Sequence, residues 1–126
     1  IYYKNDKKDK YFIYGIENRI EQIVANLLDN AVSFSEDNKE IIVRVSKSND
    51  NKVILNILDE GEGLKEKDIN KIFKRFYSNR PNKFGEHSGL GLNIVKNLVD
   101  LHNASIKASN RLNQKGANME VIFPKV

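Results

Sequence analysis

Three amide side chains stand four residues apart between Glu17 and Phe34, at Gln22, Asn26 and Asn30. Residues at this spacing lie on one face of an α-helix, one turn above the next. Asparagine is about 0.6 kcal/mol less favourable in a helix than alanine, so two asparagines in one row need an explanation. Their amide oxygens could jointly face a hard cation such as Mg²⁺, which takes oxygen ligands, or another polar ligand. A solvated polar face is the alternative, and the helix alone leaves both interpretations open.

A glycine-rich turn, DEGEG, begins at Asp59 directly after an apolar segment. Gly61 and Gly63 allow the backbone to fold tightly there. A carboxylate beside open backbone can accept a hydrogen bond from an exocyclic amine such as that of adenine, and its charge makes the bond about twice as strong as a neutral one. Taken alone, the motif is a weak signal and is more typical of an ordinary turn.

A second glycine motif, SGLGL, contains Ser88, Gly89 and Gly91 at the start of a helical pattern. The first turn of a helix has unpaired N–H groups and a partial positive charge, which together bind phosphate. Glycine inside a helix costs about 1 kcal/mol, so its position at the very start is informative. The chain has no GxxxxGK[ST] sequence, which excludes a Walker A loop. No strand directly precedes the motif, which argues against a dinucleotide-binding βαβ unit.

Length and composition indicate one globular, soluble domain. The chain has 126 residues, 40% hydrophobic and 30% charged, which suffices for a single core. Without cysteine it forms no disulfide or thiolate metal site, and no apolar run approaches the roughly 20 residues that span a bilayer. Because it begins at Ile1 and not at methionine, we expect a fragment of a longer protein.

The net charge of +4 is compatible with an anionic nucleotide ligand or with a solvated basic surface. Nucleic acid is disfavoured as a partner, because acidic residues interrupt the lysine-rich regions and no base-stacking platform accompanies them.

The apolar pattern predicts the helices that position these polar groups. Segment 17–34 is predicted to be a long helix with one buried face. A short helix is expected over 66–75 and another from Gly89 to His102, with an irregular, mobile loop over 77–88 between them. The buried face of the first helix consists of Ile20, Ile23, Val24, Leu27, Leu28 and Ala31.

Alternating apolar residues predict the strands. Segments 41–46 and 53–59 form a hairpin around a polar turn. Further strands are predicted over 1–3, 11–14, 104–109 and 118–123. Hairpins that alternate with helices indicate an α/β sandwich, in which helices cover one face of a mixed sheet.

Four motifs in order are more specific than any one of them: N-x-x-x-N on a helix, D-x-G-x-G after a strand, F-x-x-F on a short helix and G-L-G-L opening a helix. Together they resemble the ATP-binding domain of sensor histidine kinases. The resemblance covers residues 11–123 and is carried by the segments NLLDNAVSFS, DEGEGL, IFKRFYS and HSGLGLNIVKNLVDLH.

The resemblance implies the Bergerat fold of the GHKL superfamily, which type II topoisomerases, heat-shock chaperone ATPases and mismatch-repair ATPases share. That fold is a two-layer α/β sandwich with a mixed, largely antiparallel sheet of about five strands packed against three helices. Residues 1–126 would form a single catalytic ATP-binding domain, with a mobile ATP lid over about 77–88.

The resemblance also implies roles for individual residues. Asn30 would be the main Mg²⁺ ligand, and Asn26 would contact metal or phosphate beside it. Asp59 would bind the adenine amino group, and Phe34 would lie against the base. Arg75 and Arg80 are candidates for the β- and γ-phosphates, because guanidinium groups match phosphate geometry; which of them reaches stays open. The other residues expected around ATP are Ser33, Gly61, Gly63, Leu64, Phe76 (as an anchor of the lid), Ser88, Gly89, Leu90, Gly91 and Leu92.

Two positions depart from the family pattern. Many relatives carry lysine or arginine where this chain has Ser33, so weaker ATP binding, or a substitute charge from the lid, is the implied consequence. Many begin the second glycine motif with glycine where this chain has His87, which could alter the lid.

Related ATPases place a glutamate at the position of Asn26, and an amide cannot act as a general base. Slow hydrolysis and phosphoryl transfer to a histidine are therefore expected. Neither His87 nor His102 has the sequence context of a phosphoacceptor in this family, and His102 is expected to have a packing or capping role. The acceptor would lie on a separate dimerisation domain of the parent protein.

A response regulator would be the downstream partner of such a kinase. We expect a cytoplasmic domain without direct membrane contact, monomeric as an isolated chain, in a parent protein that a membrane segment could anchor. Two alternatives remain open: a serine kinase acting on an anti-sigma-factor antagonist, and a degenerate module that binds nucleotide or only partners.

Overall fold

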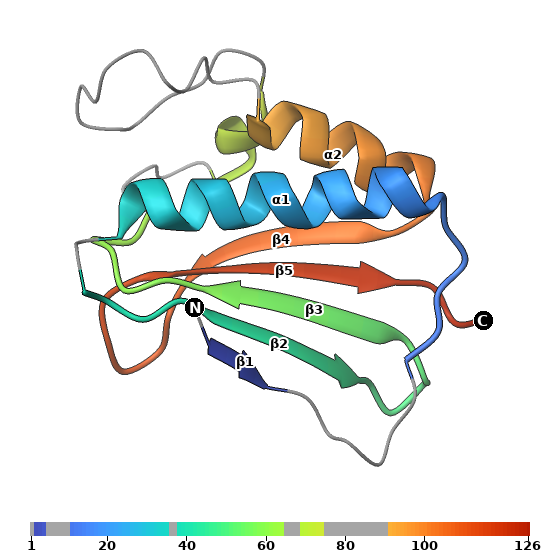
Figure 1. Cartoon of the computed structure of the whole chain (residues 1–126), viewed down its shortest axis with the longest axis horizontal. Coiled ribbons are helices and arrows are strands. Elements are labelled where there is room, and N and C mark those ends of the chain that lie inside the picture. Colours follow the sequence, from blue (N-terminus) through green and yellow to red (C-terminus); the bar gives the residue numbers. More distant parts are fainter. Residues whose placement is uncertain (1, 5–10, 36–37, 65–68, 75–90) are drawn as a thin grey trace.

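The computed structural model describes residues 2–4, 11–35, 38–64, 69–74 and 91–126. These residues form two layers, with the helices on one face of the sheet (Figure 1). In chain order the elements are β1 (Tyr2–Lys4), α1 (Glu17–Phe34), β2 (Ile42–Lys47), β3 (Val53–Leu58), the 3₁₀ helix η1 (Ile69–Phe73), α2 (Gly91–Leu101), β4 (Ser105–Asn110) and β5 (Ala117–Phe123). The predicted two-layer α/β sandwich is confirmed.

The described strands form one sheet in the order β1-β2-β3-β5-β4. The short β1 runs parallel to β2, and the other pairs are antiparallel, as a mixed, largely antiparallel sheet requires. The predicted hairpin is β2–β3, in which Lys47 pairs with Val53 and Ile42 with Leu58. Because β3 lies in the middle of the sheet, the residues that follow it reach the centre of one sheet end, beside the start of β5.

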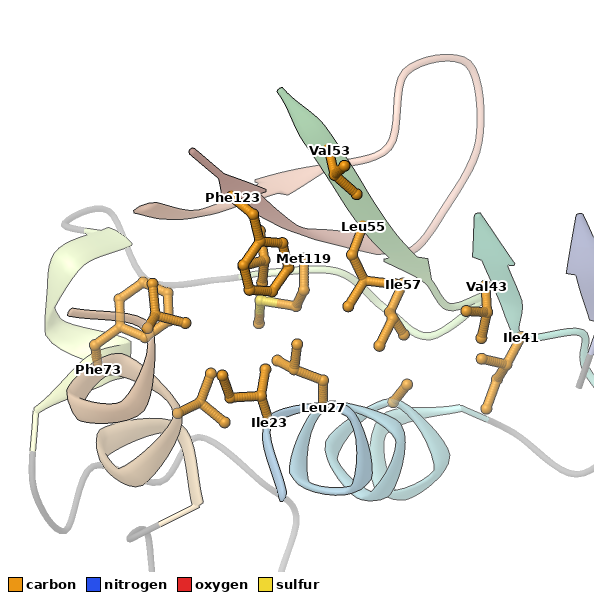
Figure 2. Close-up of a cluster of buried hydrophobic side chains, with 14 of the residues drawn as sticks. Ile23, Leu27, Ile41, Val43, Val53, Leu55, Ile57, Phe73, Met119 and Phe123 are labelled. Carbon is orange, nitrogen blue, oxygen red and sulfur yellow. The ribbon is translucent and has the colours of Figure 1, made fainter. Parts of the chain in front are cut away.

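The core lies between the sheet and the helices. Ile23 and Leu27 of α1 have no exposed surface, and Figure 2 shows both side chains directed towards the strands. Val95 and Val99 of α2 are also fully buried, and α2 packs beside α1. Each such side chain contributes roughly 1.5–3 kcal/mol. This burial fixes the rotation of α1 and therefore the direction in which its polar row points.

Two sequence-based expectations differ from the structure. Segment 11–14 forms no strand, although Tyr11 and Ile13 pack against the core while Phe12 and Tyr14 are exposed. The alternating apolar pattern correctly predicted which side chains face the core. Such a pattern does not show whether the segment pairs with a neighbouring strand. In the described part of segment 66–75, η1 is a short 3₁₀ turn in place of an α-helix, with Ile72 and Phe73 buried as expected.

His102 joins the end of α2 to the start of α1. Its Nε2 accepts a hydrogen bond from the backbone N–H of Ile16 at 3.1 Å. Its Nδ1 lies 2.7 Å from the carbonyl oxygen of Leu98, so Nδ1 is the protonated, donating nitrogen. Asn103, with φ 54°, ends the helix in the left-handed conformation. The packing or capping role expected for His102 is confirmed.

Among the described residues, neither α-helix combines the length and the apolar character needed to cross a membrane. The lid predicted over 77–88 lies outside the described residues.

Candidate functional site

Asp59 is the first residue after the central strand β3, and it is only 4% exposed. Its Oδ1 accepts hydrogen bonds from the backbone N–H groups of Gly61 at 2.9 Å and Ala117 at 3.0 Å. Its own N–H donates to the carbonyl of Ala117 at 3.0 Å. Within the described part of the chain, the carboxylate's hydrogen bonds all go to Oδ1. The side chain is therefore held rigidly by one oxygen, and Oδ2 remains as an acceptor for a further donor.

The DEGEG turn packs against the C-terminal end of α1. A Cβ on Gly61 would lie 2.4 Å from the carbonyl oxygen of Phe34 and 3.3 Å from Asp59 Oδ1. Only glycine permits this approach, because real Cβ atoms do not come so near to backbone oxygen. Gly63 has φ +86°, the left-handed region that glycine adopts without strain. The tight backbone predicted for this motif is present, and it brings Asp59 next to Phe34.

The polar row of α1 leads to the same place. Asn26, Asn30 and Phe34 are successive members of one row, four residues apart. Asn30 is 5% exposed and Asn26 is half-buried, so the solvated-face interpretation does not apply to Asn30. The hydroxyl of Ser33 donates to the carbonyl of Asn30 at 2.9 Å. Ser33 is thus turned back onto its own helix.

The β4–β5 hairpin supports the turn from the other side, and sequence reasoning missed it. The Asn110 side chain bonds to both backbone groups of Leu64. Arg111 donates from Nη1 to the carbonyl oxygen of Asp59 at 2.9 Å. A Cβ on Gly116 would lie 2.0 Å from that same oxygen. In the sequence, the one available sign of this support was Gly116, a glycine in a polar loop, and it did not indicate a contact with Asp59.

The start of α2 carries the remaining predicted site residues that the structure describes. Gly91 is the first residue of α2 and is exposed, and a Cβ built on it meets none of the described residues within 4 Å. Leu92 is half-buried and packs against the core. Asn93 donates from Nδ2 to the carbonyl oxygen of Phe73 at 3.2 Å, which ties the first turn of α2 to η1.

The structure therefore brings together part of the predicted set. The residues that lie together at the DEGEG turn are Phe34, Asp59, Gly61 and the backbone of Gly63 and Leu64. Asn30 lies one turn of α1 before Phe34. Figure 1 shows that β3, α1 and the β4–β5 hairpin all reach this end of the molecule. Predicted site residues that lie outside the described residues are Arg75, Phe76, Arg80, Ser88, Gly89 and Leu90.

These observations define a class: a two-layer α/β domain with a buried, rigidly held carboxylate at the end of its central strand, beside an asparagine-bearing helix. Residues 15–126 match the family model described as "Histidine kinase-, DNA gyrase B-, and HSP90-like ATPase". The chain belongs to this family.

Curated relatives and solved structures agree with this family. The chain is 40% identical over 116 residues to the sensor protein ChvG of Agrobacterium fabrum, covering 90% of this chain and 19% of that protein. It is 33% identical over 118 residues to the sensor protein kinase PmrB of Pseudomonas aeruginosa, covering 94% of this chain and 24% of that protein. The catalytic domain of the histidine kinase ThkA superposes with a TM-score of 0.81 at 27% identity, over 98% of this chain and 76% of that one.

Proposed function

We propose that this chain is the catalytic domain of a longer sensor histidine kinase in a two-component system. It binds ATP with Mg²⁺ and donates the γ-phosphoryl group to a histidine on a separate dimerisation domain of the same parent, from which a response regulator receives it. The domain works in the cytoplasm. The observation that carries the proposal is the buried carboxylate of Asp59, fixed through Oδ1 by two backbone donors beside the end of α1. The names of the relatives, which are sensor proteins and sensor kinases, support the same function.

Asp59 selects adenine. An ionised oxygen that is fixed in position accepts a hydrogen bond from the exocyclic amine of adenine, whereas guanine presents a carbonyl oxygen there and is repelled. Phe34 at the end of α1 supplies apolar surface for the base, and the backbone of Gly63 and Leu64 forms the opposite wall.

Asn30 and Asn26 hold Mg²⁺. Both asparagines offer amide oxygens from one helix face, and the burial of Asn30 fits a ligand whose rotamer is fixed before the ion binds. The bound ion supplies charge neutralisation at the phosphates. Arg75, Arg80 and the N–H groups from Ser88 to Gly91 complete phosphate binding in this proposal.

Transfer to a histidine is favoured over hydrolysis, because no carboxylate on α1 is in place to activate water. Asn26 carries an amide, which is not a base. Glu21 and Glu17 are exposed and lie nearer the start of the helix, and Asp29 is exposed as well. Phosphoryl transfer by this domain therefore depends on positioning and charge stabilisation.

Replacing Asn30 with alanine tests the metal site. We expect Asn30→Ala to remove most of the gain in affinity that Mg²⁺ gives a non-hydrolysable ATP analogue, a loss of about 100-fold for one essential ligand. Titration of wild type and variant, with and without Mg²⁺, measures it. Asn18→Ala on the exposed side of α1 is the matched control and should bind as wild type. Equal Mg²⁺ dependence in wild type and Asn30→Ala would remove Asn30 from the site.

Replacing Gly91, at the start of α2, should maintain or raise stability and weaken nucleotide binding. Packing within the described residues does not require Gly91, because an added Cβ meets open space. Gly91→Ala should therefore leave the domain as stable as wild type or up to about 1 kcal/mol more stable. Binding of the ATP analogue should weaken by roughly tenfold, because the methyl group stands where phosphate approaches the helix start.

Asn97→Ala is the control for this pair, as an exposed position on the same helix. It should raise stability by about 0.6 kcal/mol through helix propensity alone and leave binding unchanged. Thermal unfolding and analogue titration of the two variants separate the effects. A Gly91→Ala variant that binds the analogue as tightly as wild type would contradict a phosphate site there.

A further inference from the structure

We propose that Asn110 is a positioning residue for nucleotide binding, because its side-chain amide fixes the backbone of Leu64 at the far end of the DEGEG turn. This inference rests on the proposed function and adds to it a residue from the β4–β5 hairpin. Asn110 holds the wall of the base pocket in place and contacts no part of the nucleotide.

The contact is a two-point clamp between a side chain and a backbone. Oδ1 of Asn110 accepts from the Leu64 N–H at 2.6 Å, and Nδ2 donates to the Leu64 carbonyl oxygen at 3.3 Å. A primary amide offers an acceptor and a donor side by side, which matches the N–H and C=O of one residue. Asn110 is the last residue of β4, so the sheet fixes the position from which it reaches across.

The turn needs such a contact because its own residues supply little order. Gly61 and Gly63 have no side chains and lose more conformational freedom on ordering than other residues. The near end of the turn is fixed by Asp59, and its middle by the approach of Gly61 to Phe34. At the far end, Gly63 adopts φ +86°, and Asn110 Oδ1 lies 2.7 Å from where its Cβ would be.

Without the clamp, the Gly63–Leu64 backbone would be ordered only when the nucleotide binds, and that ordering would reduce affinity. The loss should act on the base and not on the phosphates. Asn110→Ala is therefore expected to weaken binding of an ATP analogue, ADP and adenosine by the same factor, about tenfold. The ratio of affinities with and without Mg²⁺ should stay as in wild type.

The experiment compares wild type, Asn110→Ala, Ser109→Ala and Asp59→Asn. Ser109 is the exposed neighbour on β4 and should have no effect on binding. Each variant is titrated with the ATP analogue, ADP and adenosine at a temperature well below its unfolding midpoint, so that loss of folded protein does not imitate loss of affinity. Amide hydrogen exchange at Leu64 is measured in parallel, and it should become faster in Asn110→Ala and not in Ser109→Ala.

Wild-type affinity in Asn110→Ala, or unchanged exchange at Leu64, would overturn the inference. So would a loss that appears only with ATP and Mg²⁺, because it would place the effect at the phosphates. The proposed function fails by a different result, in which wild type itself does not bind the analogue or Asp59→Asn binds it as tightly as wild type.

Discussion

Asp59→Asn should weaken binding of an ATP analogue by about 100-fold or more, while the domain stays folded. Asparagine keeps an oxygen at the position of Oδ1, where the N–H groups of Gly61 and Ala117 donate. It replaces Oδ2 with an NH₂ group, so the site then presents a donor to the adenine amine and loses its charge. The two oxygens of Asp59 thus have separate tasks, one in the fold and one in recognition.

Asp59→Ala is the comparison that separates these tasks. It leaves two buried N–H groups without their acceptor, at about 1–3 kcal/mol for each unsatisfied group. Denaturant unfolding should therefore show a clear loss of stability for Asp59→Ala and little change for Asp59→Asn, although both lose nucleotide. If Asp59→Asn binds the analogue like wild type, the adenine assignment is wrong.

Much of the fold could be predicted because its signals are local. The apolar stripe with Ile23 and Leu27 predicted the long helix with the bounds that α1 has, Glu17–Phe34. Apolar residues at helical spacing lie on one face of a helix, and that face is buried against the core. The β2–β3 hairpin was predicted for a similar reason, since alternation and a polar turn lie within one short stretch. Segment 11–14 shows the limit of prediction from local patterns, because its alternating side chains pack against the core although the segment forms no strand.

The candidate site could be predicted only where its residues carry chemistry of their own. Asp59 and Gly61 were identified from their residue types and their position after a strand. Asn110 and Arg111 were not, because they act on residues 46 and 52 positions away through contacts that no local pattern encodes. The bond between Ile16 and His102 spans 86 positions and is equally invisible to periodicity. Residues that support a site are found from tertiary structure.

Gly116→Ala should strongly destabilise this domain, with a loss of about 3 kcal/mol or more. Two independent penalties meet there. Gly116 has φ +124°, which residues with a Cβ rarely adopt. The new Cβ would also lie 2.0 Å from the carbonyl oxygen of Asp59, and this is backbone that cannot move without displacing the carboxylate. Arg111, bonded to the same carbonyl, would be displaced too.

Denaturant unfolding of Gly116→Ala and Gly91→Ala measures the contrast, because the two variants make the same chemical change. At Gly91 the methyl group meets none of the described residues, and at Gly116 it meets the Asp59 backbone. Gly116→Ala should lower the unfolding midpoint strongly, and the protein that remains folded should bind the ATP analogue weakly because Asp59 has moved. A midpoint equal to that of wild type would mean that the β4–β5 hairpin shifts away at little cost. The hairpin would then not be the rigid support that holds Asp59 and Leu64.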